Sequence, residues 1–171
     1  MITGGADTTV VDRAGRPVLA AEARSRFDVS SSWAAGTFRN LYAHGSVPDV
    51  PFFLLAVPDT FYLWKHPRRK ADEAFMEGRR SALGDPEVPP DYAVPAWDLV
   101  RPYLGRPGGR DPDPREVSSY AMRMALDAFL AEVLNARDLT RETAAPNLWW
   151  LFDSGLYEAM RGGSLAGAVA G

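Results

Sequence analysis

Residues 7–24 have the sequence DTTVVDRAGRPVLAAEAR, and this stretch decides how the fold begins. Thr8 to Val11 is a β-branched run that predicts a strand. Asp12 to Gly15 supplies turn residues, including a glycine that tolerates a positive φ. Val18 to Ala23 is a second, largely apolar run and begins directly after Pro17. The stretch therefore predicts a β-hairpin.

The elements after the hairpin continue a mixed pattern. Trp33 to His44 has apolar residues at helical spacing, with serines before it as caps and Gly45 as a natural stop. Phe52 to Val57 is a continuous apolar run, typical of a central strand, and Phe61 to Lys65 predicts the next strand. The order β-β-α-β-β indicates an α+β protein.

The second half of the chain predicts mostly helix. Arg68 to Arg80 is expected to be an exposed, charged helix, Gly84 to Pro95 a proline-rich surface crossing, and Arg106 to Pro112 a loop. Leu99 to Leu104 is only weakly defined. Helices of the third part are expected from Asp113-Pro114-Arg115-Glu116 to Asn135, with a face of Val117, Tyr120, Met124, Ala128 and Phe129, and from Asn147 to Arg161.

A chain of 171 residues is long enough for one core. We expect residues 1–66 to form that core, with residues 67–112 as a charged helix and a Pro/Gly-rich crossing. Residues 113–171 would be a helical part of the same domain or a small appendage. A signal peptide and a long apolar run are not evident, so we expect a cytoplasmic protein with no membrane partner.

Composition restricts the metal chemistry. The chain has no cysteine and only two histidines, which excludes disulfides, thiolate sites and histidine-rich zinc sites. A bound metal would be a hard cation on carboxylates, such as Mg²⁺ or Mn²⁺. The net charge of −3 does not indicate a nucleic-acid binder, although basic residues are concentrated in the first 80 positions.

Two carboxylates and one cation are expected to meet at one end of the hairpin. Side chains alternate along a strand, so Glu22 and Arg24 project to the same side. The hairpin brings Asp7, at the start of the first strand, near the end of the second. Carboxylates can hold a divalent metal, and a nearby cation can stabilise charge on a phosphate.

This arrangement resembles the PD-(D/E)XK nuclease superfamily. Asp7 matches the aspartate of that motif, with Ala6 where proline is usual, and Glu22-Ala23-Arg24 matches its E-x-K element with arginine for lysine. The resemblance implies a restriction-endonuclease-like mixed sheet with the C-terminal helices packed on it. It also implies DNA phosphodiester hydrolysis, with Mg²⁺ or Mn²⁺ on Asp7 and Glu22 and with Arg24 positioning water or phosphate.

The phrases around Phe52 to Lys65 and Trp149 to Ala159 are similar to uncharacterised bacterial proteins with this nuclease-like core. Arg26, Arg39 and Lys65 are weaker candidates for contacts with the nucleic-acid backbone. Asp12 is interpreted as a turn residue rather than a ligand.

Two departures from the superfamily leave other functions open. Arginine stays protonated and cannot act as a base. Members of the superfamily usually have a helix before the first core strand, and only six residues precede Asp7, which is expected of a shortened chain or a late start. The alternatives are a weakened or inactive nuclease, a non-catalytic nucleic-acid-binding or interaction module, and a structural subunit that docks a partner through its C-terminal helices. Glu22 could also serve only in a salt bridge with Arg24 or Arg26.

Overall fold

The computed structural model describes residues 6–81, 87–105, 109–136 and 138–166. Within them, six strands form one sheet in the order β5-β4-β3-β2-β1-β6. The strands are β1 (Thr8–Val11), β2 (Pro17–Ala23), β3 (Phe52–Val57), β4 (Thr60–Lys65), β5 (Tyr92–Pro95) and β6 (Ser164–Leu165). The α-helices are α1 (Ser31–Ala43), α2 (Pro67–Ser81), α3 (Trp97–Val100), α4 (Ser119–Asn135), α5 (Trp149–Asp153) and α6 (Leu156–Met160). The 3₁₀ turns are η1 (Arg101–Tyr103), η2 (Pro114–Glu116) and η3 (Pro146–Leu148).

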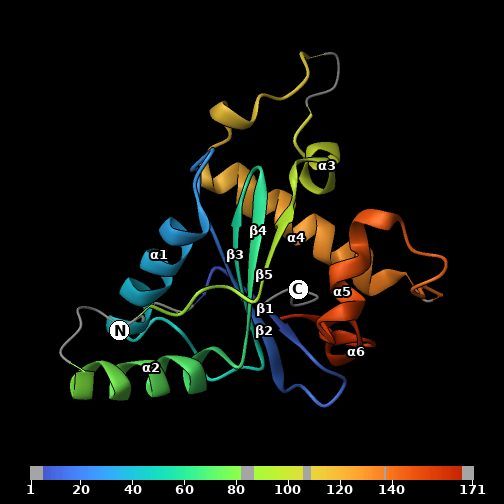
Figure 1. The fold of residues 1–171 in the computed structure, drawn as a ribbon. Coiled ribbons are helices and arrows are strands. Elements are labelled where there is room, and N and C mark those ends of the chain that lie inside the picture. The colour runs from blue at the N-terminus through green and yellow to red at the C-terminus, as the bar shows by residue number, and fades with distance from the viewer. Residues whose placement is uncertain (1–5, 82–86, 106–108, 137, 167–171) are drawn as a thin grey trace.

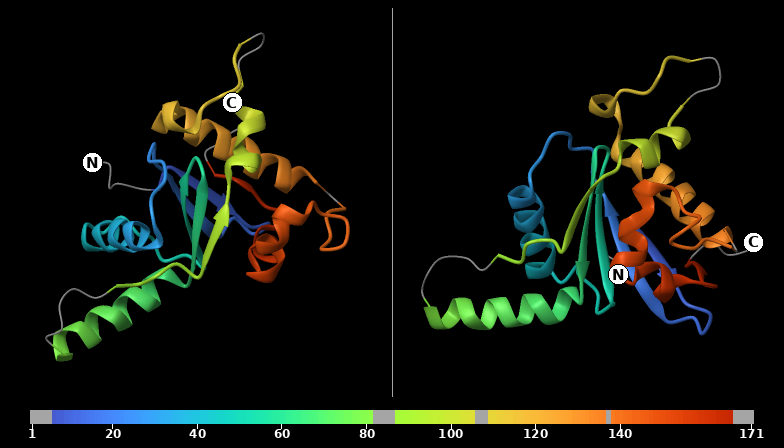
Figure 2. Two further views of the ribbon diagram at one scale, coloured as in Figure 1. Left: turned by 45° about the horizontal axis from the view of Figure 1, so that its top comes forward. Right: turned by 45° about the vertical axis from the view of Figure 1, so that its right-hand side comes forward.

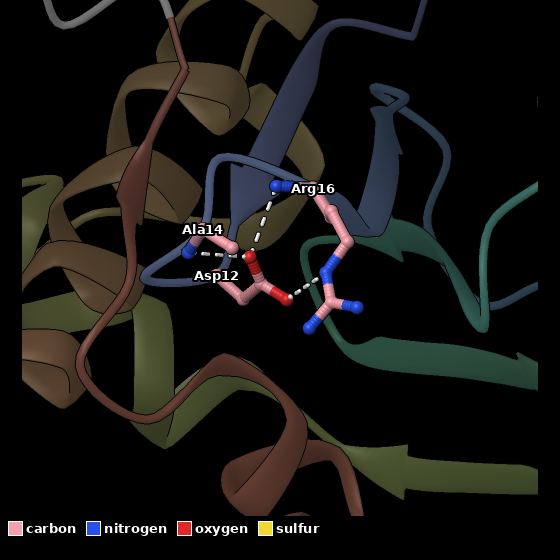
Figure 3. Close-up of polar contacts among 3 residues, drawn as sticks. All are labelled: Asp12, Ala14 and Arg16. Carbon is pink, nitrogen blue, oxygen red and sulfur yellow. Dashed lines mark hydrogen bonds and ion pairs between the residues drawn. The ribbon is translucent and has the colours of Figure 1, made fainter.

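The β1–β2 hairpin is closed by a turn built around Asp12 (Figure 3). The Asp12 carboxylate accepts hydrogen bonds from the backbone N–H of Ala14 and of Arg16, both at 2.9 Å, and from Arg16 Nε at 3.0 Å. Gly15 takes the positive φ of 80° that the turn requires. The interpretation of Asp12 as a turn residue agrees with these contacts.

The register of the hairpin contains one irregularity. Val10 pairs with Leu19 but Val11 pairs with Pro17, so Val18 is an extra residue in β2. Because of this bulge, Val18 and Leu19 both pack into the same core cluster although they are adjacent in sequence. From Leu19 onward, regular alternation resumes and reaches Glu22 unbroken.

The centre of the sheet is the parallel pair β2 and β3. A parallel pair needs a crossover between its strands, and α1 provides it. β3 then turns at Pro58 and Asp59 into β4, which pairs with it antiparallel along its whole length. The residues of β3 are all buried, as expected for a strand that is covered on both faces.

Helices cover both faces of the sheet (Figure 1). Figure 2 shows α1 and α2 on one side and α4, α5 and α6 on the other. On the first side, Phe38 of α1 stacks on Trp64 of β4, with ring centroids 4.8 Å apart. On the second side, Phe61 of β4 meets Phe129 of α4 at 5.8 Å. The α+β class and the packing of the C-terminal helices on the sheet are therefore confirmed.

Two predicted elements are wrong in detail. The proline-rich crossing contains edge strand β5, whose last residue is Pro95, a position where a missing N–H costs no ladder bond. Asp113 does cap a turn, accepting from the N–H of Arg115, but this turn is η2 alone. Helix α4 starts only at Ser119, with Ser118 as its N-cap.

The last predicted helix is broken, and the predicted face of α4 is displaced. Gly155, with a φ of 86°, separates α5 from α6. Val117 and Phe129 of the predicted face are buried, but Tyr120 and Met124 are 74% and 51% exposed, because the buried stripe of α4 follows another line of residues. That stripe consists of Met122, Ala125, Leu126, Phe129, Leu130 and Val133. Leu99 lies in the short helix α3, and the predicted loop at 106–112 falls partly outside the described residues.

Among the helices that the structure describes, none combines the length and the apolar character needed to cross a membrane.

Two glycines should respond to alanine in opposite directions. A Cβ at Gly163, just before β6, would lie 1.9 Å from the Val11 carbonyl oxygen, whereas a Cβ at Gly36 in α1 meets nothing within 4 Å. We expect Gly163→Ala to lower the free energy of unfolding by about 1–3 kcal/mol. Gly36→Ala should raise it by about 0.5–1 kcal/mol. Urea denaturation of both variants tests this, and equal effects would contradict it.

Candidate functional site

The candidate site lies where β2 and β3 end. Thr8 pairs with Ala21, so the residue before β1, Asp7, stands opposite Glu22. Ala21 and Ala23 belong to the core cluster under α4, so Glu22, between them, points to the opposite face of the sheet. The two acidic side chains thus share one face, as the alternation of the strand predicts.

The contacts of Asp7, Glu22 and Arg24 bind them into one group. Asp7 Oδ2 accepts a hydrogen bond from the Ala23 N–H at 2.9 Å. Arg24 Nη1 donates to Glu22 Oε2 at 2.8 Å and to the Ala23 carbonyl oxygen at 3.3 Å. The carboxyl groups of Asp7 and Glu22 also lie within side-chain hydrogen-bonding reach of each other, and this contact raises the pKa of Glu22.

A negative charge on Glu22 is unfavourable, because this residue is only 6% exposed. Burial raises the pKa of its carboxyl, and the negative charge of Asp7 raises it further. The guanidinium of Arg24 opposes both effects by hydrogen bonding and by its charge. The site therefore holds two carboxyl groups that repel each other when both are charged, and the single positive charge of Arg24 offsets this repulsion only in part.

Arg24 connects the buried acids to solvent. Its backbone N–H donates to the Ala56 carbonyl oxygen at 2.9 Å, which extends the parallel ladder past the end of β2. Its side chain is 35% exposed while that of Glu22 is 8% exposed. A ligand approaching this end of the sheet would meet the guanidinium first.

The loop after Arg24 is held by two aromatic contacts. Arg26 lies over the ring of Trp33, with its guanidinium carbon 6.0 Å from the centroid. Arg115 of η2 lies over Phe27 at 5.7 Å. The predicted backbone contact Arg26 is thus two residues from Arg24, and Arg115 is a neighbouring cation that the sequence did not indicate.

The other two weak candidates are placed differently. Lys65 pairs with Phe52, at the opposite end of the sheet from Leu55, the partner of Glu22. A single ligand that contacts Glu22 would have to extend along three residues of β3 to reach it. Arg39 lies on α1, on the same side of the sheet as Glu22, and already takes part in other interactions.

One residue of this region was missed at the sequence level. The Thr8 hydroxyl donates to Asp127 Oδ1 on α4, and Thr8 is 7% exposed. This bond ties the first residue of β1, next to Asp7, to a helix 119 residues away in sequence. The available signal was a lone carboxylate inside an apolar helix, which is costly unless it has a partner.

Asp7 and Glu22 could hold a hard divalent cation, but two carboxylates are a small set of protein ligands for such an ion. Mg²⁺ is usually bound by one or two carboxylates and keeps several waters. The carboxyl groups of Asp7 and Glu22 lie close enough to interact by charge and by a side-chain hydrogen bond, and a bound cation would relieve their mutual repulsion. In the described ranges, however, no group of three or more acidic or histidine side chains gathers around one point.

No family model matches the chain, and neither does any curated protein or solved structure. A role for Asp7, Glu22 and Arg24 therefore has to be argued from their geometry and chemistry.

The raised pKa of Glu22 predicts a specific pH dependence. A carboxyl whose pKa is higher in the folded state stabilises the fold at low pH, and this contribution is lost as the pH rises through the folded pKa. Glu22→Gln removes the charge but keeps an acceptor for Arg24. We expect it to raise the free energy of unfolding at pH 7, with the gain vanishing near pH 4.

Asp12→Asn is the matched control from the same hairpin. Hydrogen bonds from the Arg16 and Ala14 N–H groups lower the pKa of Asp12, so its contribution is present at neutral pH and is lost in acid. Its substitution should therefore cost stability at pH 7 and less at low pH. Urea titrations from pH 3 to 8 measure both, and the same sign for both variants would contradict the analysis.

Proposed function

We propose that the protein is a metal-dependent nuclease-like hydrolase acting on DNA phosphodiesters, with Asp7, Glu22 and Arg24 as its site. The observation that carries this proposal is the pairing of Asp7 with Glu22 on one face of the sheet, with Arg24 bonded to Glu22 at 2.8 Å. The order β1-β2-α1-β3, with β3 parallel to β2, is also what the resemblance to PD-(D/E)XK nucleases implies.

The three side chains divide the work of hydrolysis. In the reaction a water oxygen forms a bond to phosphorus, the bond from phosphorus to one bridging oxygen breaks, and the departing oxygen takes up a proton. Arg24, which stays protonated, would donate hydrogen bonds to the non-bridging oxygens as their charge increases. Asp7 and Glu22 would hold a Mg²⁺ ion, which when bound polarises the phosphoryl oxygen and lowers the pKa of its water.

A second function is favoured by Arg24 itself. Its guanidinium occupies one oxygen of Glu22, and arginine cannot supply the deprotonated group that a lysine can. Arg24 and Arg26 follow β2, and Arg115 lies over the ring of Phe27 in the same loop. Cations near the end of β2 would suit binding to a phosphate backbone without hydrolysis. The alternative is a nucleic-acid-binding module derived from the same type of fold.

The first test is plasmid nicking by purified full-length protein with Mg²⁺ or Mn²⁺. We expect nicking by the wild type, and a loss of at least about a hundredfold in Glu22→Gln, because the ion loses a charged ligand. Asp12→Asn removes the same charge from an exposed turn and should leave nicking unchanged. Nicking that survives Glu22→Gln would contradict the assignment of the site.

A second test restores the lysine of the motif. Lysine is a compact point charge that can shift its pKa, so Arg24→Lys should increase nicking if arginine limits the rate. We expect a gain of roughly tenfold, in the range typical of a positioned proton-transfer group. A decrease would indicate that Arg24 works through its planar fork.

Metal binding separates the two functions. If the acids bind Mg²⁺ with a dissociation constant near 1 mM, then 10 mM Mg²⁺ should stabilise the fold by about 1.4 kcal/mol, and Glu22→Gln should abolish the effect. If Mg²⁺ gives no stabilisation and no nicking while DNA still binds, the non-catalytic module is the correct function.

A further inference from the structure

A second polar region lies at the far end of β1 from Asp7. It is a cavity of about 670 Å³ between the hairpin turn, the last turn of α4 and the end of α6. Small-molecule sites usually measure about 300–1,000 Å³. The exposed residues Arg13 and Arg161 line it, together with the half-buried apolar residues Leu134 and Ala136.

The charge of this cavity is opposite to that of the chain. The protein has a net charge of −3, yet the lining residues that belong to the described ranges include two arginines and no acidic residue. Neither Arg13 nor Arg161 makes an ion pair or a side-chain hydrogen bond with the residues that the structure describes. The carboxylate nearest in sequence, Asp12, is already committed to Arg16 and Ala14 (Figure 3).

Gly162 allows Arg13 to lie next to the residue pair Arg161-Gly162. The side chain of Arg13 lies across Gly162, where an added Cβ would be 2.1 Å from Arg13 Nε. Gly162 has a φ of 75° and directly follows Arg161. Arg13 therefore packs against the residue that follows Arg161, and both arginines line the same cavity although they come from opposite ends of the sequence.

We propose that this cavity binds a small phosphorylated organic anion of mononucleotide size. Arg13 and Arg161 would bind the phosphate, because two planar guanidinium groups match the geometry of a dianionic phosphate. Leu134 and Ala136, which are half-buried, would contact the apolar part of the ligand. The Tyr157 hydroxyl is not available, because it donates to the Ala136 carbonyl oxygen at 3.3 Å. This site shares no residue with Asp7, Glu22 and Arg24 and does not depend on their function.

Calorimetric titration of the full chain tests the site, with deoxythymidine 5′-monophosphate, ribose 5-phosphate, inorganic phosphate and thymidine as probes. The monophosphate should bind saturably with a dissociation constant of about 1 mM or below, and thymidine should not bind. Arg13→Ala and Arg161→Ala should each weaken binding about tenfold or more, since each removes charge-assisted hydrogen bonds. Ribose 5-phosphate binding equally well would support a site for phosphate esters in general.

Two controls make the result decisive. Arg123→Ala removes the same charge from an exposed position of α4 outside the cavity, and Glu22→Gln alters only the other site. Both should bind the monophosphate like the wild type. The proposal is overturned if no probe binds up to about 10 mM. It is also overturned if binding survives Arg13→Ala with Arg161→Ala, or if Arg123→Ala weakens binding as much as they do.

Discussion

The register between β1 and β2 is the constraint on which the rest of the molecule depends. Thr8 opposite Ala21 places Asp7 opposite Glu22, and a slip of one residue would turn every side chain of β2 to the other face. Glu22 would then point into the apolar cluster under α4. The Asp12 turn and the bulge at Val18 hold the register in place. The same register therefore determines both where Asp7 and Glu22 lie and which residues of β2 pack in the core.

The hairpin carries two carboxylates with opposite effects on stability. Asp12 is partly buried in its turn and accepts hydrogen bonds from backbone donors, so its charge supports the fold. Glu22 is buried beside Asp7 and is only partly compensated by Arg24, so its charge opposes the fold. A glutamine would satisfy Arg24 as well, and a hydrophobic residue would suit the strand. Locally unfavourable choices of this kind are concentrated at functional sites.

The part of the fold that follows from local patterns could be predicted from the sequence. Apolar and β-branched runs located β1 to β4, and the predicted hairpin placed Asp7 near Glu22. The errors arose where a local signal was real but its extent was set by tertiary packing: the Asp113 cap made one turn, and Gly155 ended a helix that periodicity would have continued. The Thr8–Asp127 bond and the Arg13–Arg161 cavity join residues distant in sequence, and no local pattern records them.

The short strand β6 has a consequence for how the chain reaches its final state. Ser164 and Leu165 pair with Val11 and Val10, so the edge of the sheet beside β1 is completed by nearly the last described residues. During synthesis, the amino-terminal hairpin leaves the ribosome long before this strand exists. Its outer edge must remain unpaired for that interval, when it could recruit strands of other nascent chains. The outer edge of β1 is therefore paired only after β6 has been synthesised, and until then this edge is open to aggregation with other chains.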